Sequence, residues 1–313
     1  MKKALKIIGI IILILLVLIA ALLWAMKKAP AAPTDYQTKV KTGGEIEATY
    51  MKDGKYAVSE VQQPAFQSFS PYTICYPDEM IDSAQTWPVI VLCNGTGTPL
   101  SKYPAVAKHY ASWGFIVIGT EEEFSWNGFG AEMCARHLIL LNNTKEFDKD
   151  EPNIFYHKIN LEDMGVVGHS QGGVGVFSTI TNQSHKNLFK AAVSLSPTNQ
   201  EGAQKMEWYY DVSKIQIPIL LISGAGGGDD WVVTGEQLES IYNDITSDKI
   251  MMRRKDTPHG EVLYSEDGYV TAWFMWRLKG DQEAAKAFLG PDAEILKNPL
   301  YQDQKVDVEI DVK

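Results

Sequence analysis

Residues 161–177 constrain the fold of this chain more than any other segment. The apolar run from Met164 to Val167 predicts a buried strand, and the small residues after Gly172 predict a helix that packs closely on a sheet. Between them, Gly168-His-Ser-Gln-Gly172 is a Gly-x-Ser-x-Gly motif. Such a turn strains its serine and lifts the hydroxyl clear of the backbone, so glycine is needed two positions to either side. The motif also arises by chance in glycine-rich turns, but this context favours Ser170 as a catalytic nucleophile.

The composition is that of a globular protein with an acidic surface. The chain has 313 residues, of which 45% are hydrophobic and 22% charged, enough for one large domain or two small ones. A net charge of −10 argues against a nucleic-acid partner. The three cysteines, Cys75, Cys93 and Cys134, form no CxxC pair and no zinc pattern, so we expect no metal. A disulfide between Cys75 and Cys134 is left open.

The N-terminal 28 residues have the pattern of a membrane segment. Three lysines in the first six residues precede an uncharged apolar run over residues 7–26, and two lysines follow it. This run of 20 residues is long enough to cross a bilayer and longer than the usual core of a cleaved signal peptide. We therefore expect a signal anchor over residues 1–28, with the rest of the chain outside the cytoplasm. If the segment is cleaved, the protein is secreted.

The remainder alternates between predicted strands and predicted helices. Residues 29–60 read as a linker and weakly structured extension, and residues 61–313 as the catalytic domain. Apolar runs predict strands at 70–76 (an edge strand), 87–93, 115–119, 164–167, 191–195, 217–223 and 249–254, and helical periodicity predicts helices at 104–112, 130–141, 233–245 and 261–279. This alternation predicts an α/β fold with a mostly parallel sheet and helices on both faces. The polar tail after Gly290 reads as irregular.

A histidine is needed to take the proton from the serine hydroxyl. In open α/β sheets with this motif, the acid and then the histidine follow the serine along the chain. Of six histidines, only His185 and His259 follow Ser170, and His185 comes too early to lie beyond the next two strands. His259 lies in a turn-forming loop after the last predicted strand of the sheet. It is the expected general base, the alternative being an ordinary loop histidine.

The acid should follow the predicted strand at 217–223. That strand runs into Gly224-Ala-Gly-Gly-Gly-Asp-Asp, and both Asp229 and Asp230 fit the role. The glycine run itself lacks the spacing and the lysine of a phosphate-binding loop.

Two backbone amides are expected to stabilise the oxyanion of a tetrahedral intermediate. One is the N–H of Gln171, the residue after the nucleophile, and the other is the N–H of Thr96, in the glycine-rich loop after the strand at 87–93. Phe124 or Trp126 is a candidate substrate-binding residue, because both follow a strand at the active-site edge of the sheet, with a packed loop as the alternative. Trp231 is the better candidate, because it lies next to the expected acid.

With these residues in place, the chain resembles serine hydrolases of the α/β-hydrolase superfamily over roughly residues 71–290. The nearest branch holds cutinase-like polyesterases, chlorophyllase-like proteins and platelet-activating-factor acetylhydrolase-like esterases. The segments that carry the likeness are Pro88-Val-Ile-Val-Leu-Cys-Asn-Gly95, Tyr110-Ala-Ser-Trp-Gly-Phe-Ile-Val-Ile118, Gly168-His-Ser-Gln-Gly-Gly173 and Thr271-Ala-Trp-Phe-Met-Trp-Arg-Leu-Lys-Gly-Asp281. The resemblance implies an α/β-hydrolase fold and hydrolysis of carboxylic esters, lipids or polyesters through an acyl-enzyme without a cofactor.

Carried to this chain, the resemblance implies a triad of Ser170, Asp230 and His259, with Thr96 and Gln171 as the oxyanion donors. Asp230 is preferred over Asp229 because the Asp-x-Val-Val that it begins resembles the acid loop of the superfamily. The chain departs from the branch in its longer glycine-rich acid loop, in its Asn-Gly-Thr-Gly oxyanion loop and in lacking a C-terminal cysteine pair. Substrate identity therefore does not follow from the resemblance.

Two other classes of function fit the same sequence, one enzymatic and one non-catalytic. An acyltransferase or a peptidase uses the same triad, and a non-catalytic surface binding domain can keep a hydrolase scaffold. A non-catalytic binding domain would be expected to lack a member of the triad. Every member has a candidate in this sequence, which argues against that alternative. Acyl-chain length and oligomeric state are left open by the sequence.

Overall fold

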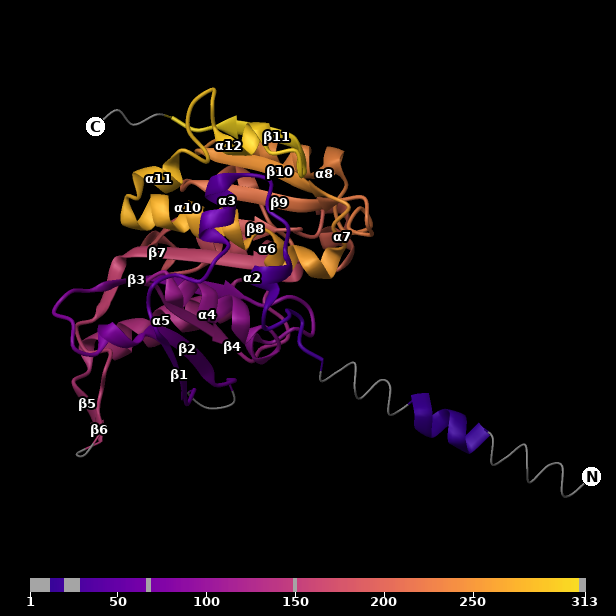
Figure 1. Cartoon of the computed structure of the whole chain (residues 1–313). Coiled ribbons are helices and arrows are strands. Elements are labelled where there is room, and N and C mark those ends of the chain that lie inside the picture. The colour runs from indigo at the N-terminus through magenta and orange to yellow at the C-terminus, as the bar shows by residue number, and fades with distance from the viewer. Residues whose placement is uncertain (1–11, 20–28, 66–68, 149–150, 310–313) are drawn as a thin grey trace, which may run out of the picture.

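The computed structural model describes residues 12–19, 29–65, 69–148 and 151–309. Its centre is a nine-stranded sheet with the order β1-β2-β4-β3-β7-β8-β9-β10-β11 (Figure 1). In that order the strands are β1 Val58–Gln63, β2 Tyr72–Pro77, β4 Ile116–Thr120, β3 Trp87–Cys93, β7 Ile159–His169, β8 Phe189–Leu195, β9 Ile219–Ala225, β10 Lys249–Lys255 and β11 Tyr301–Asp307. A separate two-stranded hairpin joins β5 Glu146–Asp148 to β6 Glu151–Pro152.

The sheet is parallel through its middle and antiparallel at its edges. Strands β4, β3, β7, β8, β9 and β10 pair in parallel, whereas β1, β2 and β11 run antiparallel to their neighbours. The predicted α/β architecture is therefore confirmed, with some changes at the strand ends. We expected β2 at the edge of the sheet, but β1 forms that edge and β2 is the next strand in. Strand β7 begins at Ile159, before the predicted residue 164.

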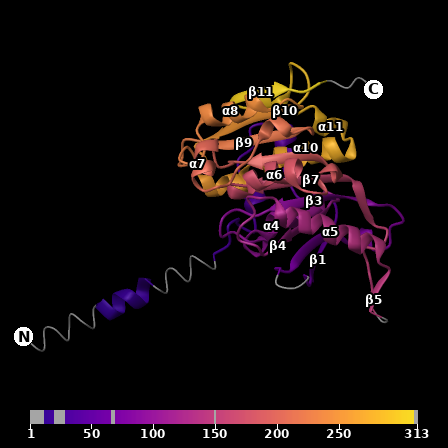
Figure 2. The same ribbon diagram turned by 180° about the vertical axis from the view of Figure 1, so that it is seen from behind.

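Helices cover both faces of the sheet, as Figures 1 and 2 show from opposite sides. One apolar cluster joins the sheet to α4 and α10 together with the N-terminal helices, and a second joins it to α5, α6 and α8. The helices are α2 Tyr36–Lys39, α3 Glu45–Tyr50, α4 Pro104–Ser112, α5 Phe129–Asn143, α6 Gln171–Asn182, α7 Gln200–Lys205, α8 Gly235–Asp244, α9 Val262–Ser265, α10 Asp267–Lys279, α11 Gln282–Ala285 and α12 Glu294–Lys297.

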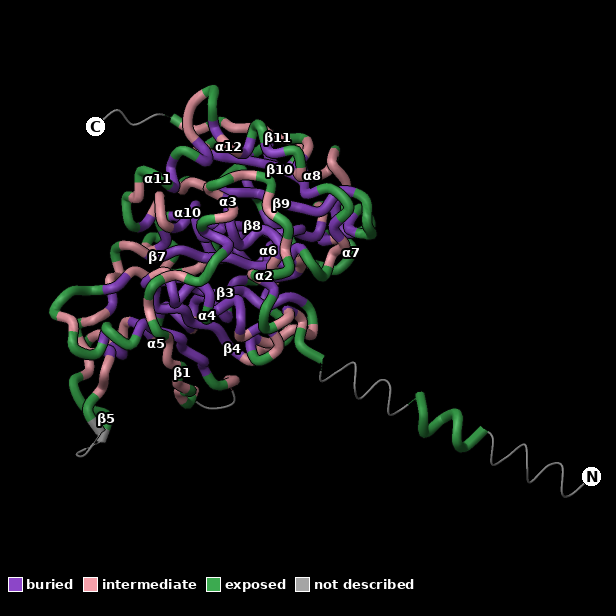
Figure 3. The backbone as a smooth tube through the Cα atoms, in the orientation of Figure 1, coloured by how far each residue is buried: buried purple, intermediate pink, exposed green. Residues whose placement is uncertain are grey.

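Strand β3 shows why the central strands are continuous apolar runs. Val89 and Val91 lie in the cluster under α5 and α6, while Ile90 and Leu92 lie in the cluster under α4 and α10. Because successive side chains of a strand point to opposite faces, a strand covered on both sides needs apolar residues at every position. The burial of the sheet between two helical layers is visible in Figure 3.

Two regions that we expected to be irregular are ordered. Within residues 29–60, the helices α2 and α3 pack on the core through the buried side chains of Tyr36 and Tyr50. The Tyr36 hydroxyl donates to Asp267, and the Tyr50 hydroxyl donates to Asp281 over 2.7 Å. The tail forms α12 and β11, which pairs with β10. These elements were missed because they are short and their outer faces are polar.

The predicted membrane anchor over residues 1–28 lies mostly outside the described residues. The part of it that the structure describes, residues 12–19, is an exposed helical stretch. Among the residues that the structure describes, no helix combines the length and the apolar content needed to span a bilayer. All three cysteines are buried free thiols, so the structure does not contain the disulfide that was left open between Cys75 and Cys134.

Candidate active site

Ser170 occupies the sharp turn between β7 and α6. Its φ of 60° and ψ of −121° place it in a strained region that serine rarely adopts. Its amide donates to the carbonyl of Leu195 over 2.8 Å, which ties the turn to β8. A Cβ atom on Gly168 would overlap the Gly172 carbonyl, and one on Gly172 would overlap the Cys93 carbonyl. The turn therefore needs both glycines of the motif, for the steric reason that the sequence indicated.

His259 lies beside Ser170 at the end of the sheet. Its Nε2 is 2.9 Å from Ser170 Oγ, a hydrogen-bond distance across 89 residues of sequence. His169 supports this loop by donating from its Nε2 to the His259 carbonyl over 2.8 Å. Burial, and then the proximity of His259, lower the pKa of His169 to about 3, so this second imidazole stays neutral at physiological pH.

Asp229, not Asp230, contacts the histidine. His259 Nδ1 lies 2.6 Å from Asp229 Oδ1, and the Asp229 side chain is completely buried. The other carboxylate oxygen, Oδ2, accepts hydrogen bonds from Ser196 Oγ over 2.8 Å and from the Gly224 amide over 2.6 Å. The preference for Asp230, taken from the resemblance, is corrected by these contacts.

Asp230 points to the other side of the loop. Its carboxylate, with the side chain half exposed, pairs with Arg253 and accepts a hydrogen bond from the Gly226 amide over 3.2 Å. Arg253 also donates to the Gly224 carbonyl from two nitrogens, over 2.9 and 3.1 Å. Asp230 and Arg253 thus brace the glycine-rich turn that carries Asp229.

The Thr96 loop lies against the serine turn. A Cβ atom on Gly95 would sit 3.7 Å from Ser170 Cβ, in ordinary contact. The backbone amides of Thr96 and Gln171 donate to no described residue, so each keeps a free donor. The Gln171 side chain joins the two segments: its Nε2 donates to Thr96 Oγ1 over 3.1 Å, and its Oε1 accepts from the Ser125 amide over 2.7 Å.

The two candidate substrate-binding tryptophans differ in their surroundings. Trp231 is 75% exposed, and its ring lies 5.2 Å from the His259 ring at 65°. Trp126 is partly buried and packs against the apolar cluster beneath α5 and α6. The structure therefore brings Trp231 to His259, whereas Trp126 packs mainly against the apolar cluster.

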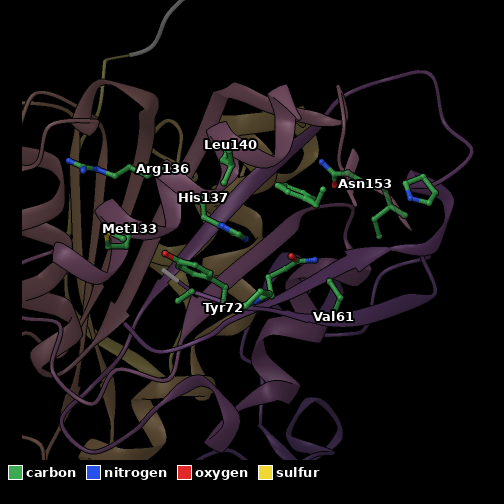
Figure 4. A pocket seen from close by; sticks show the side chains of 13 residues that line it. Val61, Tyr72, Met133, Arg136, His137, Leu140 and Asn153 are labelled. Carbon is green, nitrogen blue, oxygen red and sulfur yellow. The ribbon is translucent and has the colours of Figure 1, made fainter. Parts of the chain in front are cut away.

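A cavity of about 680 Å³ lies away from these residues, along α5 (Figure 4). Its walls include Tyr72 and His137, whose rings stack with centroids 4.2 Å apart. None of the candidate site residues lines it. Within the described part of the chain, no group of three or more His, Cys, Asp or Glu side chains is placed to hold a metal ion.

The fold and the site together are those of an α/β-hydrolase. The serine lies on a strand-to-helix turn, the aspartate and the histidine lie on later loops, and all three lie at the carboxyl edge of a mostly parallel sheet. The chain belongs to the PET hydrolase-like family, whose model matches residues 36–299. The match runs from α2 past α12, and it confirms the resemblance to the polyesterase branch. A search of curated proteins found no match.

Ser196, like His169 and Arg253, is a residue at this site that sequence reasoning missed. It follows β8 in the segment Leu195-Ser-Pro197, which matches no catalytic motif. Only its contact with Asp229 in the folded chain shows that it belongs to the site.

Proposed function

We propose that this protein hydrolyses carboxylic esters through a covalent acyl-enzyme on Ser170. The observation that carries the proposal is the chain of hydrogen bonds from Ser170 Oγ through His259 to the buried Asp229. A hydroxyl becomes a nucleophile when an oriented imidazole takes its proton, and a buried carboxylate stabilises the imidazolium that forms. This arrangement meets both requirements.

The reaction takes place in two steps. His259 Nε2 accepts the Ser170 proton while Oγ attacks the ester carbonyl carbon, and the free amides of Thr96 and Gln171 donate to the oxyanion. His259 then gives the proton to the departing alkoxide, which leaves as the alcohol. In the second step His259 deprotonates a water molecule that attacks the acyl carbon. His259 then returns this proton to Ser170 Oγ as the bond from Oγ to the acyl carbon breaks and the carboxylic acid leaves.

The proposed substrates are carboxylic esters, with polyesters among them. Membership of the PET hydrolase-like family supports this class, and so does the exposed ring of Trp231 beside His259. Rates on p-nitrophenyl esters of increasing chain length and on a polyester film test the proposal, with Ser170→Ala as the control. Turnover of esters that Ser170→Ala lacks supports it. An amide as the only substrate, or transfer to an alcohol acceptor without hydrolysis, would favour a peptidase or an acyltransferase instead.

We also propose that the catalytic domain works outside the cytoplasm, either tethered by residues 1–28 or released after cleavage. The support is the uncharged run at 7–26 between two groups of lysines. Protease treatment of intact cells should remove a tethered domain. A soluble, shortened chain in the medium would indicate cleavage, and full protection from the protease would contradict the proposal.

A further inference from the structure

Ser196 has an unusual backbone for a buried serine. It lies directly after β8, has no solvent-exposed surface, and has a φ of 42°, in the left-handed region. Its amide donates to the carbonyl of Ile222 over 2.7 Å, which fixes the residue between β8 and β9. Non-glycine residues held in this region are strained and persist where the surrounding structure demands them. Glycine would fit this backbone more easily than serine.

The Ser196 side chain has one hydrogen-bond partner that explains its place. Its Oγ donates to Asp229 Oδ2 over 2.8 Å, and both residues are completely buried. The Gly224 amide donates to the same oxygen over 2.6 Å, while His259 Nδ1 lies 2.6 Å from Oδ1. The two donors on Oδ2 therefore fix the rotation of the carboxylate and leave Oδ1 facing the imidazole.

We propose that Ser196 is a positioning residue for the acid of the triad. It touches neither the substrate nor the reacting atoms and acts only through Asp229. A buried carboxylate without enough donors would rotate or take up a proton, and in either case it would stabilise the His259 imidazolium less well in the transition state. This inference rests on the ester hydrolysis proposed above and assigns one of its supports.

The test uses Ser196→Gly, because glycine removes the hydroxyl and adopts the left-handed backbone without strain. The melting temperature should change little, because relief of the strained backbone offsets part of the lost hydrogen bond. Loss of a hydrogen bond to a charged group should lower kcat about 10- to 100-fold, while KM changes less than about 2-fold. Ser194→Ala is the matched control: Ser194 is equally buried on β8, but its hydroxyl bonds the Gly173 carbonyl, so kcat should stay close to that of the wild type.

A double variant shows whether Ser196 acts through Asp229. In an Asp229→Asn background, Ser196→Gly should cause little further loss in the rate of labelling by a fluorophosphonate, because the group that it orients has already been changed. A wild-type kcat in Ser196→Gly, or an equal loss in both backgrounds, would overturn the inference. A wild-type protein that hydrolyses no ester would instead overturn the proposed function itself.

Discussion

Asp229 Oδ1 lies 2.6 Å from His259 Nδ1, across a loop that sends the next residue, Asp230, to Arg253 on its far side. Three successive glycines with positive φ, residues 226–228, precede this pair of aspartates. That turn directs the buried carboxylate to the imidazole and the half-exposed one to the guanidinium. Two chemically identical neighbours therefore have different surroundings, since Asp229 faces His259 and Asp230 braces the loop.

Asp229→Asn should lower kcat on the order of 10⁴-fold, by analogy with a triad aspartate. The amide can neither hold the Nδ1–H tautomer of His259 nor stabilise the imidazolium. Asp230→Asn keeps a side chain that can bond the loop, so its kcat should fall less than about 10-fold, since Arg253 also bonds the Gly224 carbonyl. Steady-state kinetics on one soluble ester, at matched folded concentration, compare the two. A larger loss in Asp230→Asn would reverse the assignment.

Gln171→Ala should lower kcat by about 10- to 100-fold and change KM little. The side chain holds the Thr96 loop and the Ser125 amide, so its loss lets one oxyanion donor move. Complete removal of such a donor costs about 10²–10³-fold. Gln183→Ala is a suitable control, because among the described residues its side chain bonds just the Asn127 carbonyl, at an exposed position. Unchanged kcat in Gln171→Ala would mean that its side chain does not order the oxyanion loop.

Much of the fold could be predicted from the sequence because the central strands are buried on both faces. The run at 87–93 became β3 with the same bounds, and the helix at 104–112 became α4. The outer elements gave weaker signals. Strand β11 has polar residues through most of its length, and its pairing with β10 depends on a tertiary contact that no local pattern encodes.

At the site, too, residues identified by a local motif or by chain order could be predicted, and residues identified by a tertiary contact could not. Ser170 and His259 could be found because a local motif and chain order identify them. The choice between Asp229 and Asp230 could not be made locally, since it depends on the conformation of the glycine turn and on Arg253, which comes from β10. Ser196 carried no local signal, because its role exists only through the partner that the fold brings to it.

Trp231→Ala should lower kcat/KM for aromatic esters roughly 2- to 12-fold, the range expected for loss of one aromatic contact. Because Trp231 is 75% exposed, the melting temperature should hardly change. Phe147→Ala, at a half-exposed aromatic residue lining the separate cavity along α5, is the control and should leave kcat/KM unchanged. Equal losses on aromatic and small aliphatic esters would contradict a role for Trp231 in substrate contact.

Glu266→Gln should stabilise the protein more at pH 8 than at pH 4.5. Glu266 is completely buried, and neither carboxylate oxygen has a hydrogen-bond partner among the described residues. Burial therefore raises the pKa of Glu266 well above its usual value of 4.5. The unfolded chain releases this proton above about pH 4.5 while the folded protein keeps it, so wild-type stability falls as pH rises.

The advantage of the glutamine variant should therefore grow with pH, by at most about 1.4 kcal/mol per unit. Denaturant titrations of Glu266→Gln and wild type at pH 4.5, 6 and 8 measure it. The exposed Glu162, changed to Gln, serves as the control. An advantage that stays constant across this range would show that Glu266 ionises normally in the folded state.

Covalent labelling by a fluorophosphonate, mapped by mass spectrometry, tests the central claim most directly. The wild type should carry one adduct on Ser170, because His259 Nε2 lies 2.9 Å from its Oγ and takes the proton as phosphorus is attacked. His259→Ala should label far more slowly, and Ser170→Ala should not label at all. An adduct on any other residue of the wild type, or undiminished labelling of Ser170→Ala, would contradict the account.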